Sequence, residues 1–511
     1  MAFSSVISAA LEGLHVEMIQ VEADVSNGLP MFHMVGYLSS EVKEASERVR
    51  TAIRNAGVQL PPKKIVINLS PAAVRKRGSS FDLPIALSVL LSIGYIPADS
   101  LEGTVVVGEL SLNGGIRKVS GILPSVMEAK NLGFHTCILP RENAAEGALV
   151  DGIRIIGVEH LKEVCAYLKK EIRIEPNVRG QADAEAPAGK FLVDYSDIRG
   201  QETVKRAAEI AVAGGHNLLL IGPPGSGKSM IARRIPTILP PLTREESLEI
   251  TKIYSVMGLV DEERPLITER PFRSVHHTTT KAALIGGGAV PSPGEISLAH
   301  GGVLFLDELA EFQKPVLEVL RQPLEEHQIR LARSHGNYVF PANFILAAAM
   351  NPCPCGNYPN LEKCSCSEGQ VRSYLGRISQ PFLDRMDICI EVPGVKYESL
   401  HMEERTESSG EIRKRVCRAR EIQNERYKNT GIRSNAMLGI KELEKYAGLG
   451  KTEHQLMEQA FVSLGLTART YHKILKVART IADLSGEEQV GTEHLTEAIS
   501  YRTIDKKYWG R

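Results

Sequence analysis

A glycine-rich segment that ends in Lys228 and Ser229 is the part of the sequence best suited to chemistry. It reads GPPGSGKS over residues 222–229 and lies between the apolar run NLLLI and the helical pattern MIARRI. Glycines let backbone N–H groups converge on phosphate oxygens, and the start of a helix adds positive potential. In this pattern the lysine reaches the β and γ phosphates, and the serine hydroxyl is a ligand of Mg²⁺. The expected nucleotide-binding residues are therefore Gly222, Pro223, Pro224, Gly225, Ser226, Gly227, Lys228 and Ser229.

Two carboxylates follow a second apolar run, and an amide follows a third. Residues 303–306 lead directly into Asp307 and Glu308, so both carboxylates are expected at the C-terminal end of a buried strand, where α/β sheets bind ligands. Asp307 would hold Mg²⁺ together with Ser229, and Glu308 would orient or deprotonate the attacking water. The run FILAAAM ends at Asn351, which can hydrogen-bond the γ-phosphate or the water.

Four of the eight cysteines form a second group of candidate ligands. Cys353 and Cys355, then Cys364 and Cys366, give two C-x-C pairs separated by eight residues. Four thiolates at such spacing can close a tetrahedral Zn²⁺ site with Zn–S distances of about 2.3 Å, although the usual pair is C-x₂₋₄-C. Reduced thiols without a metal are the alternative. Four sulfur ligands leave no open position, so a zinc ion here would be structural.

These residues need a parallel α/β sheet to position them. Short, wholly apolar runs separated by helical segments are typical of strands buried on both faces of such a sheet. Beyond about Val395 the pattern is helical throughout, and Thr467 is expected to cap a helix with an apolar face. A polar, Ala- and Gly-rich stretch separates this part from an N-terminal α/β part. The expected division is 1–175, a linker at 176–190, an ATPase core at 191–395 and a helical lid at 396–511.

Several local predictions concern the N-terminal part. A helix is expected with Ser40 as its N-cap and Gly57 as its stop, because one helical stripe holds the apolar residues Val42, Ala45, Val49, Ala52 and Ile53. Strands are expected at 65–69 and 104–107. Asn113 and Gly114 lie between two strand-like pieces, a composition typical of a tight type I′ turn.

Composition limits the class of protein. A chain of 511 residues is too long to fold around one hydrophobic core, so more than one domain is expected. Its content of 43% hydrophobic and 24% charged residues is ordinary for globular domains. Lys plus Arg and Asp plus Glu are both 61, so a nucleic-acid partner would have to be held by local basic patches. The sequence has no signal-peptide pattern and no apolar stretch of membrane-spanning length, and its cysteine usage fits a reducing compartment. We therefore expect no membrane association and a cytoplasmic location.

Nearly the whole chain resembles the magnesium-chelatase-like AAA+ ATPases, specifically their YifB/ComM branch. The blocks that carry the resemblance are DIRGQ at 197–201, GPPGSGKS at 222–229, PFRSVHHTTT at 271–280, GEISLAHGGVLFLDELAEF at 294–312, MNPCPCG at 350–356, RISQPFLDRMDI at 377–388 and LTARTYHKILKVARTIADL at 466–484. The resemblance implies that Asn351 is sensor 1, Arg385 the arginine finger and Arg469 sensor 2. It also implies ATP and Mg²⁺ as cofactors, a homo-oligomeric ring, expected to be a hexamer, and a branch-migration helicase acting on single-stranded or branched DNA in natural transformation.

Residues 105–143 resemble the Lon-type protease domain, which has a ribosomal S5 domain 2-like α+β fold. Alignment on GEL and the following SG puts the Lon lysine at Leu123, which cannot act as a base. Ser79 and Ser80 lie near the expected nucleophile, but a serine before a helical segment is more commonly a cap. The resemblance therefore implies a proteolytically inactive domain used for binding or assembly. Its basic residues, a second candidate for phosphate contact, are Lys63, Lys64, Arg75, Lys76 and Arg77.

DNA contact is expected from the stretch HHTTTKAALIGGGAVPSPG at 276–294. Its three consecutive glycines permit a mobile loop, and His276, His277 and Lys281 supply donors for phosphate oxygens. A purely structural insertion is the alternative reading. The alternative functions are a metal-insertion motor of the magnesium-chelatase type, a nucleotide-gated protein-interaction or remodelling ATPase, and an ATP-dependent protease, against which Leu123 argues.

Overall fold

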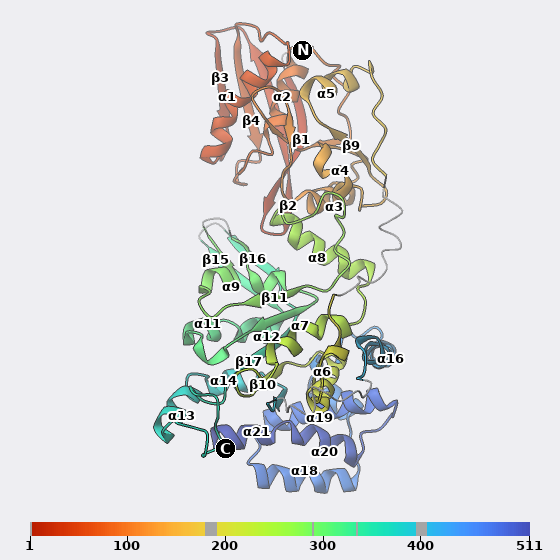
Figure 1. The fold of residues 1–511 in the computed structure, drawn as a ribbon. Helices are drawn as coiled ribbons and strands as arrows, with labels where there is room; N and C mark the ends of the chain where they lie inside the picture. Colours follow the sequence, from red (N-terminus) through yellow and green to blue (C-terminus); the bar gives the residue numbers. More distant parts are fainter. Residues whose placement is uncertain (1–2, 179–191, 289–290, 334–335, 395–405, 511) are drawn as a thin grey trace. The chain divides into compact units, whose positions relative to one another are not determined.

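The computed structural model describes residues 3–178, 192–288, 291–333, 336–394 and 406–510 (Figure 1). It divides into two compact units, of which the first comprises Met1–Pro187 and Thr243–Thr268, and the second Ala188–Leu242 and Glu269–Arg511. Most of the expected linker, and the expected boundary at 395, lie outside the described residues. The segment Thr243–Thr268, which the sequence suggested to be part of the ATPase core, belongs to the first unit. No helix of the described residues is both long and apolar enough to span a bilayer.

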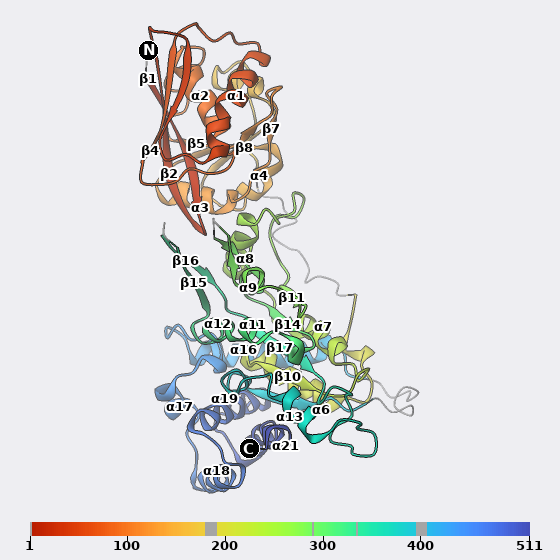
Figure 2. The ribbon, with the colours of Figure 1, turned by 90° about the vertical axis from the view of Figure 1, so that its left-hand side faces the viewer.

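The first unit is built on a seven-stranded mixed sheet with the order β3-β4-β2-β1-β5-β8-β9. These strands are β1 (Phe3–Glu12), β2 (His15–Ser26), β3 (Met31–Val35), β4 (Lys64–Ser70), β5 (Thr104–Val106), β8 (Thr136–Pro140) and β9 (Arg154–Val158). Helices α1 (Ser40–Asn55) and α2 (Asp82–Ser92) cover one face of strands β1, β2 and β4, as Figure 2 shows. Every residue of α2 is buried, because it lies between the sheet and α1.

Local predictions in this unit are mostly confirmed. The apolar stripe of α1 is buried as expected, and the expected strands form as β4 and β5. The N-cap of α1 is Ser39 rather than Ser40, so the prediction was wrong by one residue. The serine preceding α2 does not cap it either, because the N-cap is Phe81 and the Ser79 hydroxyl instead binds the Glu109 carboxylate.

The expected hairpin forms between β6 (Glu109–Leu110) and β7 (Ile116–Arg117), but its turn is wider than predicted. Five residues, 111–115, connect the strands. Asn113 Oδ1 accepts hydrogen bonds from Ser111 Oγ at 2.6 Å and from the backbone N–H of Gly115 at 3.0 Å. The asparagine therefore closes a larger loop instead of entering a two-residue turn.

Helix α8 (Arg244–Val256) is attached to the first unit through α3 (Ile122–Asn131). The backbone N–H of Gly121 donates to the carbonyl of Ser255 at 2.9 Å, and the buried Glu146 carboxylate accepts from Ser255 Oγ and from the backbone N–H of Leu123. Burial raises the pKa of Glu146, and these hydrogen bonds partly offset it. Such buried, satisfied polar contacts explain why α8 belongs to the first unit.

The second unit contains the predicted parallel sheet, with the order β11-β14-β17-β10-β18. Its strands are β10 (Leu218–Ile221), β11 (Phe272–Val275), β14 (Val303–Leu306), β17 (Ile345–Met350) and β18 (Ile388–Glu391), and every neighbouring pair is parallel. All residues of β10, β14 and β17 are buried, as their apolar composition predicted. Helices α6 (Glu202–Gly214) and α7 (Lys228–Ile238) pack into the same core as this sheet.

Described residues 406–510 are mainly helical, as expected. The helices are α16 (Ser409–Arg426), α17 (Ile440–Tyr446), α18 (Lys451–Leu464), α19 (Ala468–Ser485), α20 (Thr492–Ser500) and α21 (Thr503–Trp509). Thr467 caps α19 by accepting a hydrogen bond from the backbone N–H of Thr470, which confirms that prediction.

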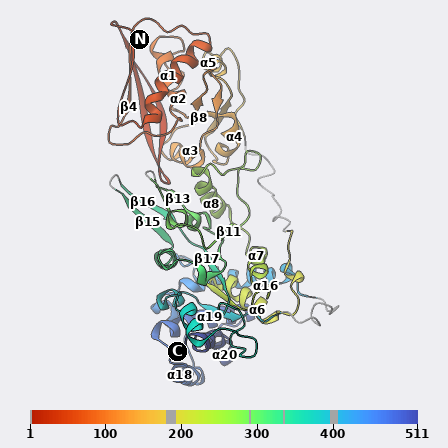
Figure 3. The ribbon, with the colours of Figure 1, turned by 60° about the vertical axis from the view of Figure 1, so that its left-hand side comes forward.

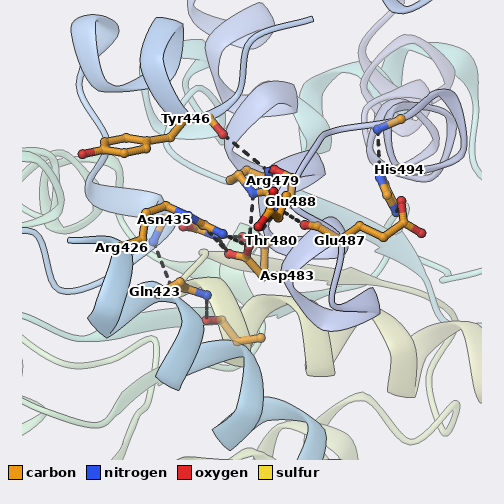
Figure 4. Close-up of polar contacts among 12 residues, drawn as sticks. Gln423, Arg426, Asn435, Tyr446, Arg479, Thr480, Asp483, Glu487, Glu488 and His494 are labelled. Carbon is orange, nitrogen blue, oxygen red and sulfur yellow. Dashed lines mark hydrogen bonds and ion pairs between the residues drawn. The ribbon is translucent and has the colours of Figure 1, made fainter. Parts of the chain in front are cut away.

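A buried polar network fixes α19 within these helices (Figure 4). The Asp483 carboxylate binds Arg426 at 2.9 Å, Arg479 at 2.9 Å and Asn435 Nδ2 at 2.8 Å. Thr480 on the same helix contacts His216 Nε2 at 2.7 Å, beside the start of β10. Removing one partner of a buried pair is costly, so this network holds the helix that carries Arg469 in a defined place.

Two hairpins extend from the second unit, as Figure 3 shows for the longer one. The short hairpin pairs β12 (Gly286–Gly287) with β13 (Ser292–Pro293), directly after helix α9 (Lys281–Ile285). The long one pairs β15 (Gln328–Arg333) with β16 (Gly336–Pro341). A Cβ added to Gly287 would lie 3.9 Å from a guanidinium nitrogen of Arg333, so the two hairpins are neighbours.

Candidate nucleotide-binding and catalytic site

The parallel sheet brings the predicted nucleotide motifs to one edge. Ile221 at the end of β10 pairs with Met350 at the end of β17, and the backbone N–H of Gly222 donates to the Met350 carbonyl at 3.2 Å. Strand β17 lies between β10 and β14, and β14 leads directly into Asp307. Because the carboxyl ends of parallel strands meet at the same edge, the phosphate loop, the two carboxylates and Asn351 share one site.

Lys228 lies in the loop as a buried cation held by three oxygens. Its Nζ donates to the carbonyls of Gly222 and Pro223, both at 2.8 Å, and to Asn351 Oδ1 at 3.1 Å. Burial lowers the pKa of Lys228, and the nearby Asp307 carboxylate opposes this shift. A phosphate group offers stronger, charged acceptors than these neutral oxygens, so the lysine is prepared to exchange its partners for a nucleotide.

Ser229 and Asp307 provide the oxygen pair expected for Mg²⁺. Ser229 Oγ donates to Asp307 Oδ2 at 2.7 Å, and the backbone N–H of Glu308 donates to Asp307 Oδ1 at 3.0 Å. Hydroxyl and carboxylate oxygens are the ligands that Mg²⁺ prefers, usually with phosphate oxygens and water completing the shell. The donor set at this edge therefore fits a magnesium nucleotide.

Glu308 lies next to two histidines that the sequence had suggested for DNA contact. In the pairing of β11 with β14, Val275 lies opposite Leu306. His277 and Glu308 each follow two residues later, so they leave the sheet next to each other. His277 Nδ1 lies 3.1 Å from Glu308 Oε2, and the His276 and His277 rings are 4.1 Å apart. Glu308 has left-handed backbone dihedrals, φ 53° and ψ 47°, which an ordinary residue adopts only under local constraint. The two histidines thus lie beside the carboxylate that the sequence predicts to be catalytic.

Arg385 and Arg469 meet at one carboxylate, that of Glu325 on helix α12 (Arg321–Glu326). Each guanidinium donates to Glu325 Oε1 at 2.6 Å. Burial would raise the pKa of Glu325, but the hydrogen bond from Arg469 and the charge of Arg385 lower it. In the described part of the chain, neither arginine has a hydrogen bond or ion pair with Lys228, Asp307 or Glu308.

The backbone around Arg385 is held by the start of β10. Asn217 Nδ2 donates to the carbonyl of Arg385 at 2.9 Å, and Asn217 N donates to Asp387 at 2.9 Å. Lys473 lies 2.9 Å from the Asp387 carboxylate. Burial alone would raise the pKa of Asp387, but Lys473 and His216 outweigh it and hold this pKa at about 2.

The four clustered cysteines converge as the spacing suggested. The Sγ atoms of Cys353, Cys355, Cys364 and Cys366 all lie within 4.8 Å of one another. The Sγ–Sγ distance is 3.4 Å between Cys353 and Cys355, 3.5 Å between Cys355 and Cys364, and 3.8 Å between Cys353 and Cys364. Four sulfurs around a tetrahedral Zn²⁺ at about 2.3 Å would be about 3.8 Å apart, so the arrangement fits this ion.

The sequence analysis predicted neither the role of Glu325 nor the β15–β16 hairpin. Glu325 lies in the run LEEH, which has no motif, and only the fold shows that two distant arginines reach it. The sequence does contain a signal for the hairpin, since residues 328–333 and 336–341 are strand-like runs separated by a serine and a histidine, and the second run begins with a glycine.

Three family models match the chain, each describing a part of magnesium chelatase. "Magnesium chelatase, subunit ChlI" matches residues 194–400, "Subunit ChlI of Mg-chelatase" matches 21–143, and "Magnesium chelatase, subunit ChlI C-terminal" matches 406–502. The first covers the phosphate loop, both carboxylates, Asn351 and Arg385. The third covers Arg469.

Full-length relatives extend this match. The chain is 44% identical to the uncharacterized protein YifB of Salmonella typhimurium over 99% of its own length and 98% of that protein. It is 42% identical to the competence protein ComM of Haemophilus influenzae, with the same two coverages. A shorter match, 33% identical over 126 residues, is to Lon protease 2 of Bacillus subtilis and covers 24% of this chain and 22% of that protein.

Proposed function

Since the chain belongs to the magnesium-chelatase-like YifB/ComM family, we propose that it is a ring-forming AAA+ ATPase that couples ATP hydrolysis to movement along DNA. The observation that carries the proposal is the meeting of the phosphate loop, Asp307, Glu308 and Asn351 at one edge of a parallel sheet. Such a site does not hold phosphates passively, because it also contains a carboxylate placed to act on water. The cofactors are ATP and Mg²⁺.

Each side chain has a defined task in this proposal. Lys228 binds the β and γ phosphates, and Ser229 with Asp307 holds Mg²⁺, which neutralises charge between those phosphates. Glu308 orients the attacking water and accepts its proton, while Asn351 hydrogen-bonds the γ-phosphate. These contacts position the reactants and stabilise charge, which is most of what phosphoryl transfer requires.

In this proposal Arg385 is the arginine finger that completes the site of a neighbouring subunit, and Arg469 is sensor 2. Both arginines gather at Glu325, and no described bond links either of them to the phosphate loop of their own chain. An arginine supplied in trans neutralises charge on the γ-phosphate and makes hydrolysis depend on assembly. A closed ring, here a homohexamer, gives every subunit such a neighbour.

The paired hairpins are the proposed grip on DNA. Lys281 at the start of α9 and Arg333 at the end of β15 are both exposed and basic, and the hairpins that they flank are neighbours. Phosphate contacts by such residues do not read base sequence, which suits a motor that moves along single-stranded or branched DNA. The name of the Haemophilus influenzae relative, a competence protein, supports a role in natural transformation.

The N-terminal unit is proposed to be a Lon-like domain without protease activity. The resemblance of residues 105–143 to the Lon-type domain supports this fold, and the chain also has a 126-residue match to Lon protease 2. Leu123, at the position aligned with the Lon lysine, is fully buried, and the Ser79 hydroxyl is bound to the Glu109 carboxylate. This geometry provides no lysine to activate a serine at that position. The proposed role of this unit is therefore binding or assembly.

Two other functions are less well supported. A magnesium-chelatase-type metal-insertion motor would use the same ATPase core, so the family models alone do not separate it from a DNA motor. A nucleotide-gated interaction module would not need a water-positioning carboxylate, yet Glu308 lies at the site edge with His277 beside it. Binding to DNA distinguishes the proposed motor from both.

Lys281→Ala is expected to reduce DNA-stimulated ATPase and to leave basal hydrolysis unchanged. The side chain is exposed on α9 and is separate from the residues that hold the nucleotide. Binding to single-stranded, duplex and branched DNA is measured by fluorescence anisotropy across a salt series. Affinity of the unmodified protein is expected to fall steeply with salt, and the variant's log–log slope is expected to be smaller by about 1.

The matched control for this experiment is Lys451→Ala, which removes an exposed lysine from α18 in the helical part. It is expected to behave like the unmodified protein. If the assembled protein with a bound ATP analogue fails to bind all three DNA forms at low salt, the DNA motor is excluded and the interaction module becomes the better reading.

A further inference from the structure

The four cysteines lie directly beside the proposed nucleotide site. Cys353 follows Asn351 by two residues, and Asn351 accepts a hydrogen bond from Lys228. The first cysteine pair lies in a turn closed by a hydrogen bond from the backbone N–H of Gly356 to the Cys353 carbonyl at 3.0 Å. The cysteine turn therefore begins where the sensor strand β17 ends.

This turn packs against the phosphate loop without a gap. Gly356 has φ 81°, and a Cβ built on it would lie only 2.2 Å from Cδ of Pro224. Only a glycine can occupy such a position, because any side chain would displace the proline and strain the left-handed backbone. Movement of the cysteine turn must consequently move Pro224, or open a space beside it.

Irregular backbone connects the four cysteines. Among its described residues, 351–367, no helix or strand forms between β17 and α13 (Glu368–Leu375). Its backbone has isolated bonds, such as Cys364 N to the Asn360 carbonyl at 2.8 Å, and the Tyr358 ring lies 6.1 Å from that of Tyr508. A cross-link through bound zinc would reduce the conformational entropy of such an irregular segment and so favour one conformation.

The sulfurs have the surroundings of metal-bound thiolates. The backbone N–H of Tyr358 donates to Cys353 Sγ at 3.4 Å, and Asn357 Nδ2 lies 3.9 Å from Cys355 Sγ. Hydrogen bonds to ligating atoms orient them and stabilise their charge. Cys353 is fully buried, and the other three cysteines are half-buried, so the ligand set is closed on the side of the protein core.

We propose that Cys353, Cys355, Cys364 and Cys366 bind one structural Zn²⁺, and that the zinc-bound turn supports the phosphate loop through Gly356 and Pro224. Loss of zinc then weakens nucleotide binding although no cysteine touches the nucleotide. This inference rests on the proposed nucleotide site. It goes further in making ATP affinity depend on a second metal.

Three variants of the full-length chain separate the two halves of this proposal. Cys364→Ser with Cys366→Ser removes the two ligands farther along the chain from Asn351, and Gly356→Ala leaves all four ligands but places a methyl group against Pro224. Cys417→Ser, on helix α16, is the matched control for loss of a half-buried cysteine. Zinc is measured by elemental analysis of protein purified without chelator, and affinity by titration with a fluorescent ATP analogue.

The unmodified protein and Cys417→Ser are expected to contain about one zinc per chain. The double serine variant is expected to lose the zinc and to bind the analogue about tenfold more weakly, the effect of one lost charged hydrogen bond. Gly356→Ala is expected to keep its zinc and to show a similar loss of affinity. Removing zinc from the unmodified protein with excess chelator, then restoring it with zinc chloride, is expected to lower and recover affinity reversibly, which avoids any dependence on how the variants fold.

Zinc far below one per chain in folded, unmodified protein would overturn the metal site. Zinc loss without any change in affinity, by mutation or by chelator, would overturn the coupling. Either failure is distinguishable from failure of the nucleotide site itself, because Lys228→Ala still tests that site when no zinc is bound.

Discussion

Lys228→Ala is expected to abolish ATP binding, whereas Glu308→Gln is expected to retain it and to stop turnover. Lys228 is the buried cation of the phosphate loop, and its three oxygen partners are all neutral, so it is available for phosphate. No hydrogen bond or ion pair of the described residues joins the Glu308 side chain to that loop, and in the proposed mechanism Glu308 acts on water. Its loss is expected to lower kcat by about 10²- to 10⁴-fold, the usual contribution of a positioned general base.

Equilibrium binding of a fluorescent ATP analogue and steady-state phosphate release measure these two effects separately. Glu311→Gln is the matched control, since this carboxylate lies three residues after Glu308 and its ion pair among the described residues, with Arg377, is exposed. It is expected to change neither quantity greatly. Equal losses of nucleotide affinity in Lys228→Ala and Glu308→Gln would contradict the roles assigned here.

Arg385→Ala is expected to be nearly inactive alone and to regain activity when mixed with Lys228→Ala. An arginine finger contributes about 10³- to 10⁵-fold to kcat. In a mixed ring, an Arg385→Ala subunit offers an intact phosphate loop, and a Lys228→Ala neighbour offers an intact arginine. Random equimolar mixing makes about a quarter of the interfaces productive, so the regained rate is expected to approach that fraction of the unmodified rate.

Phosphate release is followed while the ratio of the two variants is changed, with subunit mixing verified by energy transfer between labelled chains. Arg372→Ala removes an exposed arginine of α13 that is paired only with Glu368, and it is expected to remain active. Absence of recovery in verified mixed rings would argue against action in trans. It would assign the ion pair between the buried Arg385 and the exposed Glu325 a purely structural role.

The sequence predicts best those residues whose chemistry depends on a local pattern. The phosphate loop needs a strand, a glycine-rich turn and a helix in direct succession, and all three are readable in 217–235. The positions of Asp307 and Asn351 are also predictable from the sequence, because each residue follows an apolar run. The strands that these runs form are parallel, so their carboxyl ends lie at the same edge of the sheet. These placements needed no knowledge of how distant segments pack.

Other features depend on partners that are distant in the sequence. Helix α8 lies within the ATPase core in sequence, but its Ser255 completes the buried bonds of Glu146 in the first unit. His277 looked like a phosphate donor, yet strand register places it beside Glu308. Glu325 has no motif, and its part in gathering Arg385 and Arg469 is visible only in the fold. Tertiary packing decides such features, and local propensity does not encode it.

The most direct test of the DNA-motor account is the rate of ATP hydrolysis by the assembled protein with and without DNA. Phosphate release is measured at saturating ATP and low salt, with single-stranded, duplex and branched DNA added in turn. The account predicts strong stimulation by single-stranded or branched DNA, lost in Glu308→Gln and reduced in Lys281→Ala. An assembled, ATP-hydrolysing protein whose rate is unchanged by every DNA form would contradict it.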